Sequence, residues 1–440
     1  MNYTVFYSLL LGYAFVALFL GRQSASKIQT EEDYFLGGRK VGFFGLTMTL
    51  VATQFGGGAI VGGAEAAYQY GWLGVSYSFG IALGFIILAL GMGGRLRALN
   101  VRTVPEIFEK VYKSDFLRQY AAIIYIIAMF FILVASCVAT RKFFYGIGFT
   151  NDLFFLAFWA IIILHTMFGG LPTVVKMDII QMTLTLSVFA LVYLWMGDEA
   201  VSSVKATSFE QNSDIPWLNW VLMPCLFTVI GQDMGQRCFS AQSPKTVAKA
   251  MILAAFLQVV ASLLPAFLGI YAAKNGIGSQ NSSVLVEVVQ QLTSPLIASF
   301  FACAVLLAIL STADSLLCAV SSNVSFDIPL ITRLQTRFGL LVTRLTTFVI
   351  GFSAVILSYY ANEIIPIMIQ AYSLTICIFF VPIVVALFSK SPSKKAALVA
   401  SLVGTVAFFG LSLFPDISYK ELICIGLSFV AYLVVSKTRF

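Results

Sequence analysis

Four oxygen-bearing side chains interrupt one apolar run of the chain, and their types and spacing could bind a cation. The run AVLLAILSTADSLLCAVSS has the length of a membrane-spanning helix, yet it contains Ser311, Thr312, Asp314 and Ser315. At 100° per residue, Ser311 and Ser315 share one face, with Thr312 beside them and the carbonyl of Ala308 one turn earlier. Hydroxyl and carbonyl oxygens suit a hard monovalent cation such as Na⁺. The pattern therefore predicts an oxygen-lined cation site.

The alternative interpretation of these hydroxyls is structural. An isolated Ser or Thr in a membrane helix usually hydrogen-bonds to a carbonyl one turn earlier, or joins two helices. A cluster that also contains the carboxyl group of Asp314 is harder to explain in this way, because an acid in hydrocarbon is costly without a partner. We therefore favour the cation site.

The composition assigns the whole chain to one class. Its 440 residues are 59% hydrophobic and 11% charged, with a mean hydropathy of +0.92, which is typical of an all-α polytopic membrane protein. The lipid bilayer is the expected surrounding, and the net charge of +7 reflects loop topology, so we expect no nucleic-acid partner. The sequence shows no nucleophile with a base, no paired metal ligands and no phosphate-binding loop. We therefore expect no enzymatic activity and no catalytic residue.

Hydropathy and chain breaks predict about thirteen membrane helices. The expected segments are residues 3–21, 42–68, 71–94, 118–146, 152–170, 171–197, 216–240, 245–274, 295–326, 335–360, 363–389, 393–414 and 418–437. An odd number places the termini on opposite sides. Most of the 27 Lys and Arg residues fall in alternate loops, which predicts an outer N-terminus and an inner C-terminus. The expected outer segments hold Arg141, Lys142, Lys205, Lys274 and Lys420.

Two of these helices carry breaks at corresponding places in the chain. The first break is the glycine run Gly56, Gly57 and Gly58. The second break is Gly231, Gln232 and Asp233, where an acid stands inside an apolar span. This arrangement matches a transporter built from two inverted repeats of five helices. In such transporters the breaks form the ion and substrate sites. The competing interpretation is a pair of packing hinges made of small residues.

Four motifs resemble those of the sodium:solute symporter family, and the match covers nearly the whole chain. The motifs are EDYFLGGR at residues 32–39, TVPE at 103–106, GGL at 169–171 with Asp178 and Gln181 after it, and AILST at 308–312. The resemblance implies the leucine-transporter fold with one extra N-terminal helix and two C-terminal ones. It also implies Na⁺-coupled uptake of a small solute at a bacterial inner membrane.

This resemblance makes the chain a single transmembrane transporter domain, residues 1–440. Its expected parts are an extra N-terminal helix with an inner loop (1–41), the first inverted repeat (42–197), an outer loop with the second repeat (198–389) and two C-terminal helices (390–440). The sequence leaves the oligomeric state open, and a monomer is compatible with it.

The resemblance also assigns cation ligands by position. The family's common sodium site corresponds to the carbonyls of Ala52, Phe55 and Ala308 and the hydroxyls of Ser311 and Thr312. A second site, present in only some members, corresponds to Asp178, Ser311, Asp314 and Ser315. The chain departs from the usual pattern at Asp314, where many members have Ser or Thr.

Two neighbouring buried carboxylates cannot both stay charged without a counter-ion. Three arrangements remain open: binding of a second Na⁺ between Asp178 and Asp314, neutralisation of one acid by Arg237 or Lys176, or protonation of one acid. We favour a second, weaker cation site.

Elsewhere in the chain, the single histidine, His165, is interpreted as a core residue.

The two breaks also indicate the chemistry of the solute. Within the family they look most like those of the high-affinity choline transporter branch, but Gln54 and Gly231 stand where that branch has tryptophan. Choline recognition needs aromatic faces. Gln54, Gln232 and Asp233 instead offer two amides and a carboxylate beside the glycine run, which suits a small polar or zwitterionic solute with an amine.

Other functions remain as alternatives. Within the same family, the solute could be a sugar, a carboxylate or a vitamin. A transporter-like membrane sensor would normally need an output domain. An ion channel would need a continuous filter in place of two separated breaks. We therefore favour the symporter.

Overall fold

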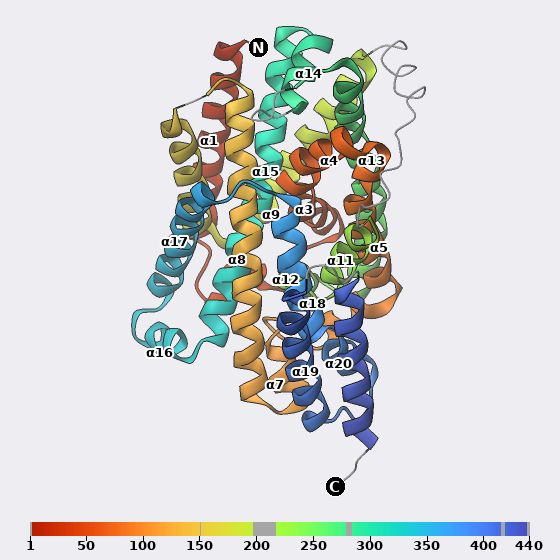
Figure 1. Ribbon diagram of the computed structural model, residues 1–440. Helices are drawn as coiled ribbons and strands as arrows, with labels where there is room; N and C mark the ends of the chain where they lie inside the picture. The colour runs from red at the N-terminus through yellow and green to blue at the C-terminus, as the bar shows by residue number, and fades with distance from the viewer. Residues whose placement is uncertain (1, 150, 197–216, 279–283, 415–418, 438–440) are drawn as a thin grey trace.

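Helices form nearly all of the computed structural model, which describes residues 2–149, 151–196, 217–278, 284–414 and 419–437. They build an elongated bundle with the N-terminus at one end and the C-terminus at the other (Figure 1). Within the described ranges, nine helical segments are long and apolar enough to cross a membrane. The acidic part of the expected outer loop, residues 198–214, lies outside the described residues.

The long helical segments follow the hydropathy of the sequence. They are α1 (Tyr3–Ala25), the run from η2 to α6 (Gly58–Ala98), α8 (Asp115–Gly146), α9 (Asp152–Trp195), α13 (Pro244–Asn275), α15 (Pro295–Asp327), α17 with η5 (Leu340–Tyr360), α18 (Ile365–Phe388) and α19 (Lys394–Ser412). The shorter helices are α2 (Glu31–Leu36), α3 (Phe43–Gln54), α7 (Glu106–Tyr112), α11 (Trp217–Ile230), α12 (Gln232–Ser240), α14 (Val284–Leu292), α16 (Pro329–Phe338) and α20 (Lys420–Lys437).

The helix α15 forms the centre of the bundle. It starts after Ser294, whose side chain accepts a hydrogen bond from the N–H of Ile297, and Pro295 occupies its first turn. In its most apolar stretch 89% of the residues are buried inside the protein, against 17% for α1. Neighbouring helices α8, α9, α17, α1 and α3 surround it. Its polar side chains are therefore shielded from lipid.

Both expected helix breaks are present. The helix α3 ends at Gln54, Phe55 is non-helical (φ −96°, ψ 64°), and the chain resumes as the π-helix η2 (Gly58–Gly62) leading into α4 (Gly63–Tyr70). Gly231 (φ −62°, ψ 143°) separates α11 from α12. The flanking helices meet in the middle of the bundle, where α12 packs against both α3 and α15 (Figure 1).

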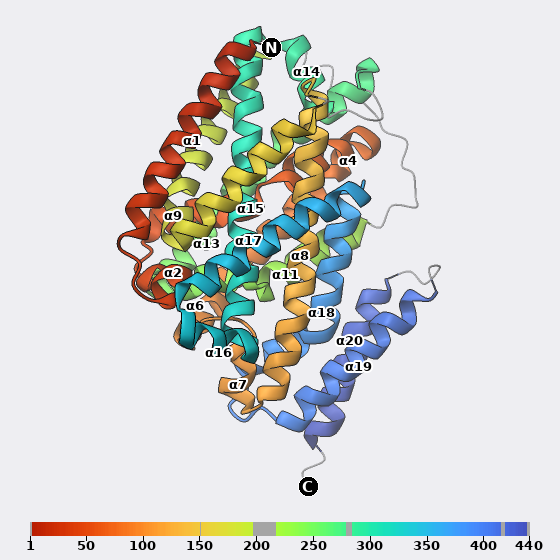
Figure 2. The ribbon, with the colours of Figure 1, turned by 90° about the vertical axis from the view of Figure 1, so that its left-hand side faces the viewer.

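Glycines with positive φ set two of the helix boundaries. Within α9 (Asp152–Trp195) the backbone leaves helical geometry at Gly170 (φ 52°, ψ −163°), just before Pro172, so two helices meet at the boundary that the sequence predicts between residues 170 and 171. Gly339 (φ 57°) separates α16 from α17, so the expected helix 335–360 begins later, at Leu340. The helix α16 lies at the end of the bundle that also carries α2, α6 (Gly93–Ala98) and α7 (Figure 2).

Candidate cation and substrate site

The oxygen cluster expected around Ser311 is assembled between α15 and the end of α3. The hydroxyl of Ser311 donates to the carbonyl oxygens of Ala52 at 3.1 Å and of Ala308 at 2.8 Å. The hydroxyl of Thr312 donates to the same Ala52 oxygen at 2.9 Å. All four residues are buried. Ser311 does bond one turn back, as the structural alternative supposes, but it also reaches across to a second helix.

The fifth expected ligand, the carbonyl of Phe55, follows directly on the last turn of α3. The N–H of Phe55 donates to the carbonyl of Val51 at 2.7 Å, and the helix ends there. Carbonyls at a helix end lack the α-helical partner that interior ones have. A Cβ on the next residue, Gly56, would stand 2.0 Å from Oγ1 of Thr312. The backbone after α3 therefore lies directly against the hydroxyl of Thr312, one of the expected cation ligands. A ligand set made only of oxygens fits Na⁺.

The remaining glycines of the first break are packed just as closely. A Cβ on Gly57 would lie 2.5 Å from Cβ of Ala139 on α8, and one on Gly58 would lie 2.5 Å from the sulfur of Met368 on α18. Real Cβ atoms do not approach neighbours so closely. The glycine run is therefore required by contact with three different helices as well as by backbone freedom.

The side chains of the two breaks meet at Gln54 and Asp233. Nε2 of Gln54 donates to Oδ2 of Asp233 at 3.0 Å, and both residues are buried. Oδ1 of Asp233 has no hydrogen-bond partner among the described residues. A Cβ on Gly231 would lie 2.6 Å from that same oxygen, so the glycine leaves space beside it. A buried acceptor without a partner is costly, and a solute N–H would satisfy it.

The side chain of Gln232 is engaged elsewhere. Its Oε1 accepts from the N–H of Val104 at 2.7 Å, and its Nε2 donates to the hydroxyl of Ser322 at 2.9 Å. Gln232 therefore ties α12 to α15 and to the segment before α7. The structure does not bring its amide to Gln54 and Asp233.

The residues of the expected second cation site are all buried, and each already has a hydrogen-bond partner. Oδ2 of Asp178 accepts from Thr49 at 2.5 Å, and Oδ1 of Asp314 accepts from Thr166 at 2.5 Å. The other oxygen of each acid, Oδ1 of Asp178 and Oδ2 of Asp314, has no hydrogen-bond partner among the described residues. Oδ1 of Asp178 is therefore available to a cation, whereas Oδ2 of Asp314 is shared with the His165 ring, whose Nε2 lies 3.4 Å away.

A buried arginine lies beside the same site. Arg237 on α12 donates to the hydroxyl of Ser315 at 2.5 Å and lies within electrostatic reach of Asp178 and Asp314. Ser315 also accepts from Thr53 at 3.0 Å. Arg237 therefore supplies one positive charge for two acids. The other expected basic residue, Lys176, donates instead to Ser24 at the end of α1.

Comparison with known proteins identifies the family. The model of the sodium:solute symporter family matches residues 34–404. The chain belongs to this family. The high-affinity choline transporter 1 of Torpedo marmorata is 24% identical to the symporter over 91% of this chain and 74% of that protein. The osmoregulated proline transporter OpuE of Bacillus subtilis is 26% identical over 90% of this chain and 86% of that protein.

Solved structures show the leucine-transporter fold. A Na⁺-coupled sialic acid symporter superposes on this symporter with a TM-score of 0.83 and 18% identity, covering 99% of this chain and 98% of that one. Mhp1, a nucleobase-cation-symport-1 family transporter, superposes with a TM-score of 0.62 and 17% identity, covering 92% and 94%. Membership in the family makes this protein a membrane transporter with Na⁺ as its coupling ion.

Sequence reasoning missed several polar neighbours of the second cation site. Nε2 of His165 lies 3.4 Å from Oδ2 of Asp314, and neither ring nitrogen has a hydrogen-bond partner among the described residues. His165 is a buried core residue, as the sequence suggested, but its ring lies beside a carboxylate of the candidate site. Thr49 and Thr53 could have been found, because their spacing of four residues puts both on one face of α3, directly before the break.

A group of aromatic residues beside Asp233 was also missed. The rings of Phe227 and Tyr372 stack with centroids 4.3 Å apart, and the hydroxyls of Tyr77 and Tyr372 are 2.7 Å apart. Tyr77 and Tyr372 both lie within electrostatic reach of Asp233. These rings come from α11, α18 and α5 (Ser76–Ile87), which are far apart in the sequence, so no local pattern could have grouped them.

Proposed function

We propose that this symporter imports a small, amine-bearing polar solute, such as an amino acid, together with Na⁺ and binds it between the two helix breaks. The observation that carries the proposal is the unpartnered Oδ1 of Asp233, next to an Oδ2 that Gln54 already satisfies. A buried carboxylate oxygen favours a cationic N–H donor. The amide of Gln54 and the glycine backbone supply polar groups for the rest of the solute.

The relatives are consistent with this class of solute. Proline, which OpuE carries, bears a positively charged nitrogen with N–H donors, whereas the nitrogen of choline is charged but has no N–H. The sodium/pantothenate symporter of Haemophilus influenzae and the sodium/glucose cotransporter of Vibrio parahaemolyticus are also similar to this chain. Pantothenate and glucose carry no amine, so neither would supply the cationic N–H donor that the carboxylate of Asp233 favours. Asp233 therefore argues for an amine-bearing solute over a vitamin or a sugar. A sensor role without transport remains the alternative from another class.

In this proposal Na⁺ is held by the carbonyls of Ala52, Phe55 and Ala308 and by the hydroxyls of Ser311 and Thr312. Four of these groups are already joined by hydrogen bonds between α3 and α15. One Na⁺ moving down about 100 mV releases roughly 2.3 kcal/mol, and a tenfold gradient adds about 1.4 kcal/mol. One ion is therefore enough to concentrate a neutral solute several hundred-fold.

Asp178, Asp314 and Ser315 form the proposed second and weaker cation site. Oδ1 of Asp178, which has no hydrogen-bond partner among the described residues, supports a bound cation, while Oδ2 of Asp314 lies 3.4 Å from Nε2 of His165. Arg237, which occupies the hydroxyl of Ser315, supports the competing arrangement in which the guanidinium supplies the counter-charge. The two arrangements differ in how many Na⁺ ions accompany each solute.

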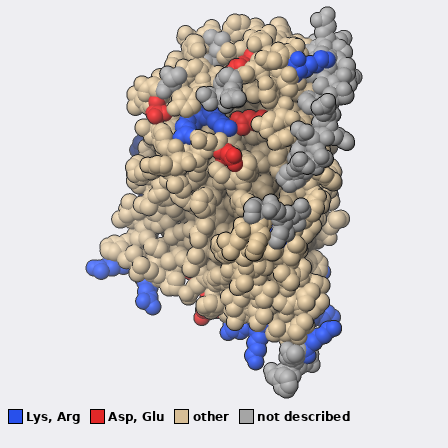
Figure 3. Space-filling model, in the orientation of Figure 1, with Lys and Arg blue, Asp and Glu red and all other residues tan. Residues whose placement is uncertain are grey.

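The proposed topology has about thirteen membrane-spanning segments, an outer N-terminus and an inner C-terminus, in a bacterial inner membrane. The two repeats cover residues 42–197 and 198–389, between the N-terminal part (1–41) and the C-terminal helices (390–440). On the face seen in Figure 3, basic side chains gather at the end that carries the C-terminus, while acidic and basic ones mix at the other end. This distribution supports the proposed orientation.

A thermal-shift screen tests the proposal directly. The purified protein is heated with amino acids, amines, sugars and carboxylates, each with Na⁺ and with K⁺ in its place. A ligand that binds the folded state raises its stability. We expect a Na⁺-dependent shift with an amine-bearing solute. A Na⁺-dependent shift with a sugar alone, or no Na⁺-dependent solute binding at all, would reject the proposed solute class.

A further inference from the structure

The helix α16 exposes an apolar stripe at the end of the bundle that carries the C-terminus. Leu330, Leu334 and Phe338 are spaced by four residues and lie on one face. Their exposed fractions are 66%, 38% and 50%. Gln335 is the only buried residue of the helix. Contact with the rest of the protein therefore does not explain the stripe.

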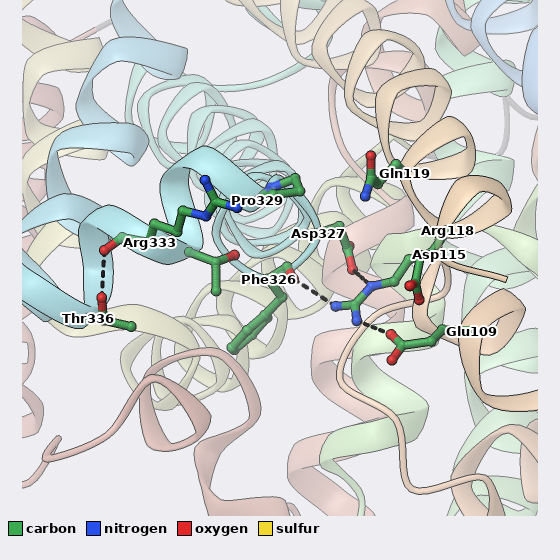
Figure 4. A pocket seen from close by; sticks show the side chains of 10 residues that line it. Glu109, Asp115, Arg118, Gln119, Phe326, Asp327, Pro329, Arg333 and Thr336 are labelled. Carbon is green, nitrogen blue, oxygen red and sulfur yellow. Dashed lines mark hydrogen bonds and ion pairs between the residues drawn. The ribbon is translucent and has the colours of Figure 1, made fainter. Parts of the chain in front are cut away.

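A different face of α16 is turned toward the protein. Thr332 and Thr336 line a cavity of about 350 Å³ that α8 closes on its far side, and Arg333, which also borders the cavity, lies between these threonines and the apolar stripe on the helix surface (Figure 4). Across the cavity Arg118 is held by Asp327 at 2.8 Å and by Glu109. The polar side of α16 thus faces other elements of the protein, and its apolar stripe is left outside.

The apolar stripe continues onto a membrane-spanning helix. After Gly339 the chain turns into α17, where Leu341, Leu345 and Phe352 are each more than half exposed (55%, 53% and 53%). In the apolar stretch of α17 only 28% of the residues are buried inside the protein. Because α17 belongs to a membrane transporter, this exposed surface faces lipid. The stripe on α16 ends at Phe338, three residues before Leu341 in the chain.

Two exposed arginines lie along one edge of the stripe. Arg333 and Arg337 lie one turn apart, and neither has an acidic partner within 4.0 Å among the described residues. The guanidinium of Arg337 lies 5.2 Å from the ring centre of Phe338. Basic residues beside an exposed apolar stripe are the pattern of helices that lie in the membrane interface. Their charge is complementary to anionic lipid headgroups.

We propose that α16 is an interfacial helix that binds anionic phospholipid. Leu330, Leu334 and Phe338 contact the acyl chains, and Arg333 and Arg337 bind the phosphate of the headgroup. This assignment does not depend on which solute the symporter carries. It predicts that the apolar stripe of α16 reaches the acyl chains of the bilayer and that the helix binds anionic lipid more tightly than neutral lipid.

Depth is tested with a fluorescent label on either side of α16. The Leu334→Cys variant places the label on the apolar stripe. The Thr336→Cys variant places it on the polar face and is the matched control. All seven native cysteines are buried, which directs the label to the new one. In vesicles of phosphatidylcholine and phosphatidylglycerol, lipids with nitroxides on the acyl chain should quench the Leu334→Cys label and leave the Thr336→Cys label bright. Equal quenching at both positions, or none at Leu334→Cys, would overturn the interfacial placement.

Charge preference is tested by titrating phosphatidylglycerol into the detergent-solubilised protein and following its thermal stability. Arg333→Gln and Arg337→Gln should each weaken binding about fivefold, which corresponds to ~1 kcal/mol per basic residue at an anionic surface. Lys390→Gln removes an exposed positive charge elsewhere and should leave binding unchanged. A loss in all three variants, or in none, would contradict the proposal. Dimer formation through the stripe, seen by mass measurement in phosphatidylcholine alone, would instead assign it to a second copy of the chain.

Discussion

The two helix breaks meet in the middle of the protein but are built in different ways. The first break is a run of three glycines pressed against α15, α8 and α18, and it contributes mainly backbone. The second break rests on a single glycine, Gly231, and contributes the side chain of Asp233. The first break thus suits cation binding through carbonyl oxygens, and the second suits selection of a solute. Variants that separate these roles test the comparison.

Gly56→Ala should have the largest effect. Its new Cβ would stand 2.0 Å from Oγ1 of Thr312, a collision at the cation site itself. Overpacking of this kind costs up to ~3 kcal/mol, so we expect Na⁺-dependent uptake into proteoliposomes to fall about a hundredfold. The control is Gly63→Ala, where a Cβ would meet no heavy atom within 4 Å. Equal uptake by the two variants would show that the first break is not packed as described.

Asp233→Asn should weaken the binding of an amine-bearing solute by about tenfold to a hundredfold, because a hydrogen bond to a charged group contributes about 1.5–3 kcal/mol. Gln54→Leu should weaken solute binding by about fivefold, since it removes a neutral hydrogen-bond donor. Solute affinity is measured by the Na⁺-dependent thermal shift. If Gln54→Leu were the more damaging variant, the solute would depend on the first break more than on the second.

Choline should bind at least about tenfold more weakly than the best primary or secondary amine, since each missing cation–π contact removes roughly 1–2 kcal/mol. Gln54 and Gly231 offer no aromatic face, and the rings of Phe227 and Tyr372 stack on each other. Competition between choline and the labelled solute in proteoliposomes measures the difference. Saturable choline uptake at micromolar concentration would contradict this prediction.

Ser311→Ala and Thr312→Ala should each raise the Na⁺ concentration for half-maximal uptake by about fivefold, because each removes one hydroxyl ligand worth ~1 kcal/mol. Ser136→Ala is the matched control, since Ser136 is buried in α8 and its hydroxyl donates to the carbonyl of Ile132, one turn earlier in the same helix. Direct Na⁺ binding to purified protein provides the second measurement. Wild-type Na⁺ affinity in Ser311→Ala would remove this residue from the site.

The smallest expected effect is a change in the slope of the Na⁺ dependence. With two cation sites, the Hill coefficient for Na⁺ should exceed one and fall to one in Asp178→Asn. A wild-type coefficient of one at saturating solute and constant pH would favour Arg237 as the resident counter-charge. Uptake that kept a single-Na⁺ dependence and rose on acidification would instead favour a protonated acid.

Much of the fold follows from sequence periodicity alone. Apolar runs long enough to span a bilayer, broken by Gly56–Gly58 and Gly231, predict the membrane helices and both breaks because the bilayer sets helix length. Local spacing also predicts the cluster of Ser311, Thr312 and the Ala308 carbonyl, because residues three and four apart on a helix share a face. These features depend only on neighbours along the chain.

The tertiary structure decided which distant groups meet. The pairing of Gln54 with Asp233, of Arg237 with Ser315 and of His165 with Asp314 joins helices that are far apart in the sequence. Hydropathy identifies a membrane helix but not its rotation, and rotation determines which partner each polar side chain meets. Helix rotation also explains why the side chain of Gln232 is engaged elsewhere. Its position beside Asp233 predicts a place in the substrate site, but its amide is hydrogen-bonded to Val104 and Ser322.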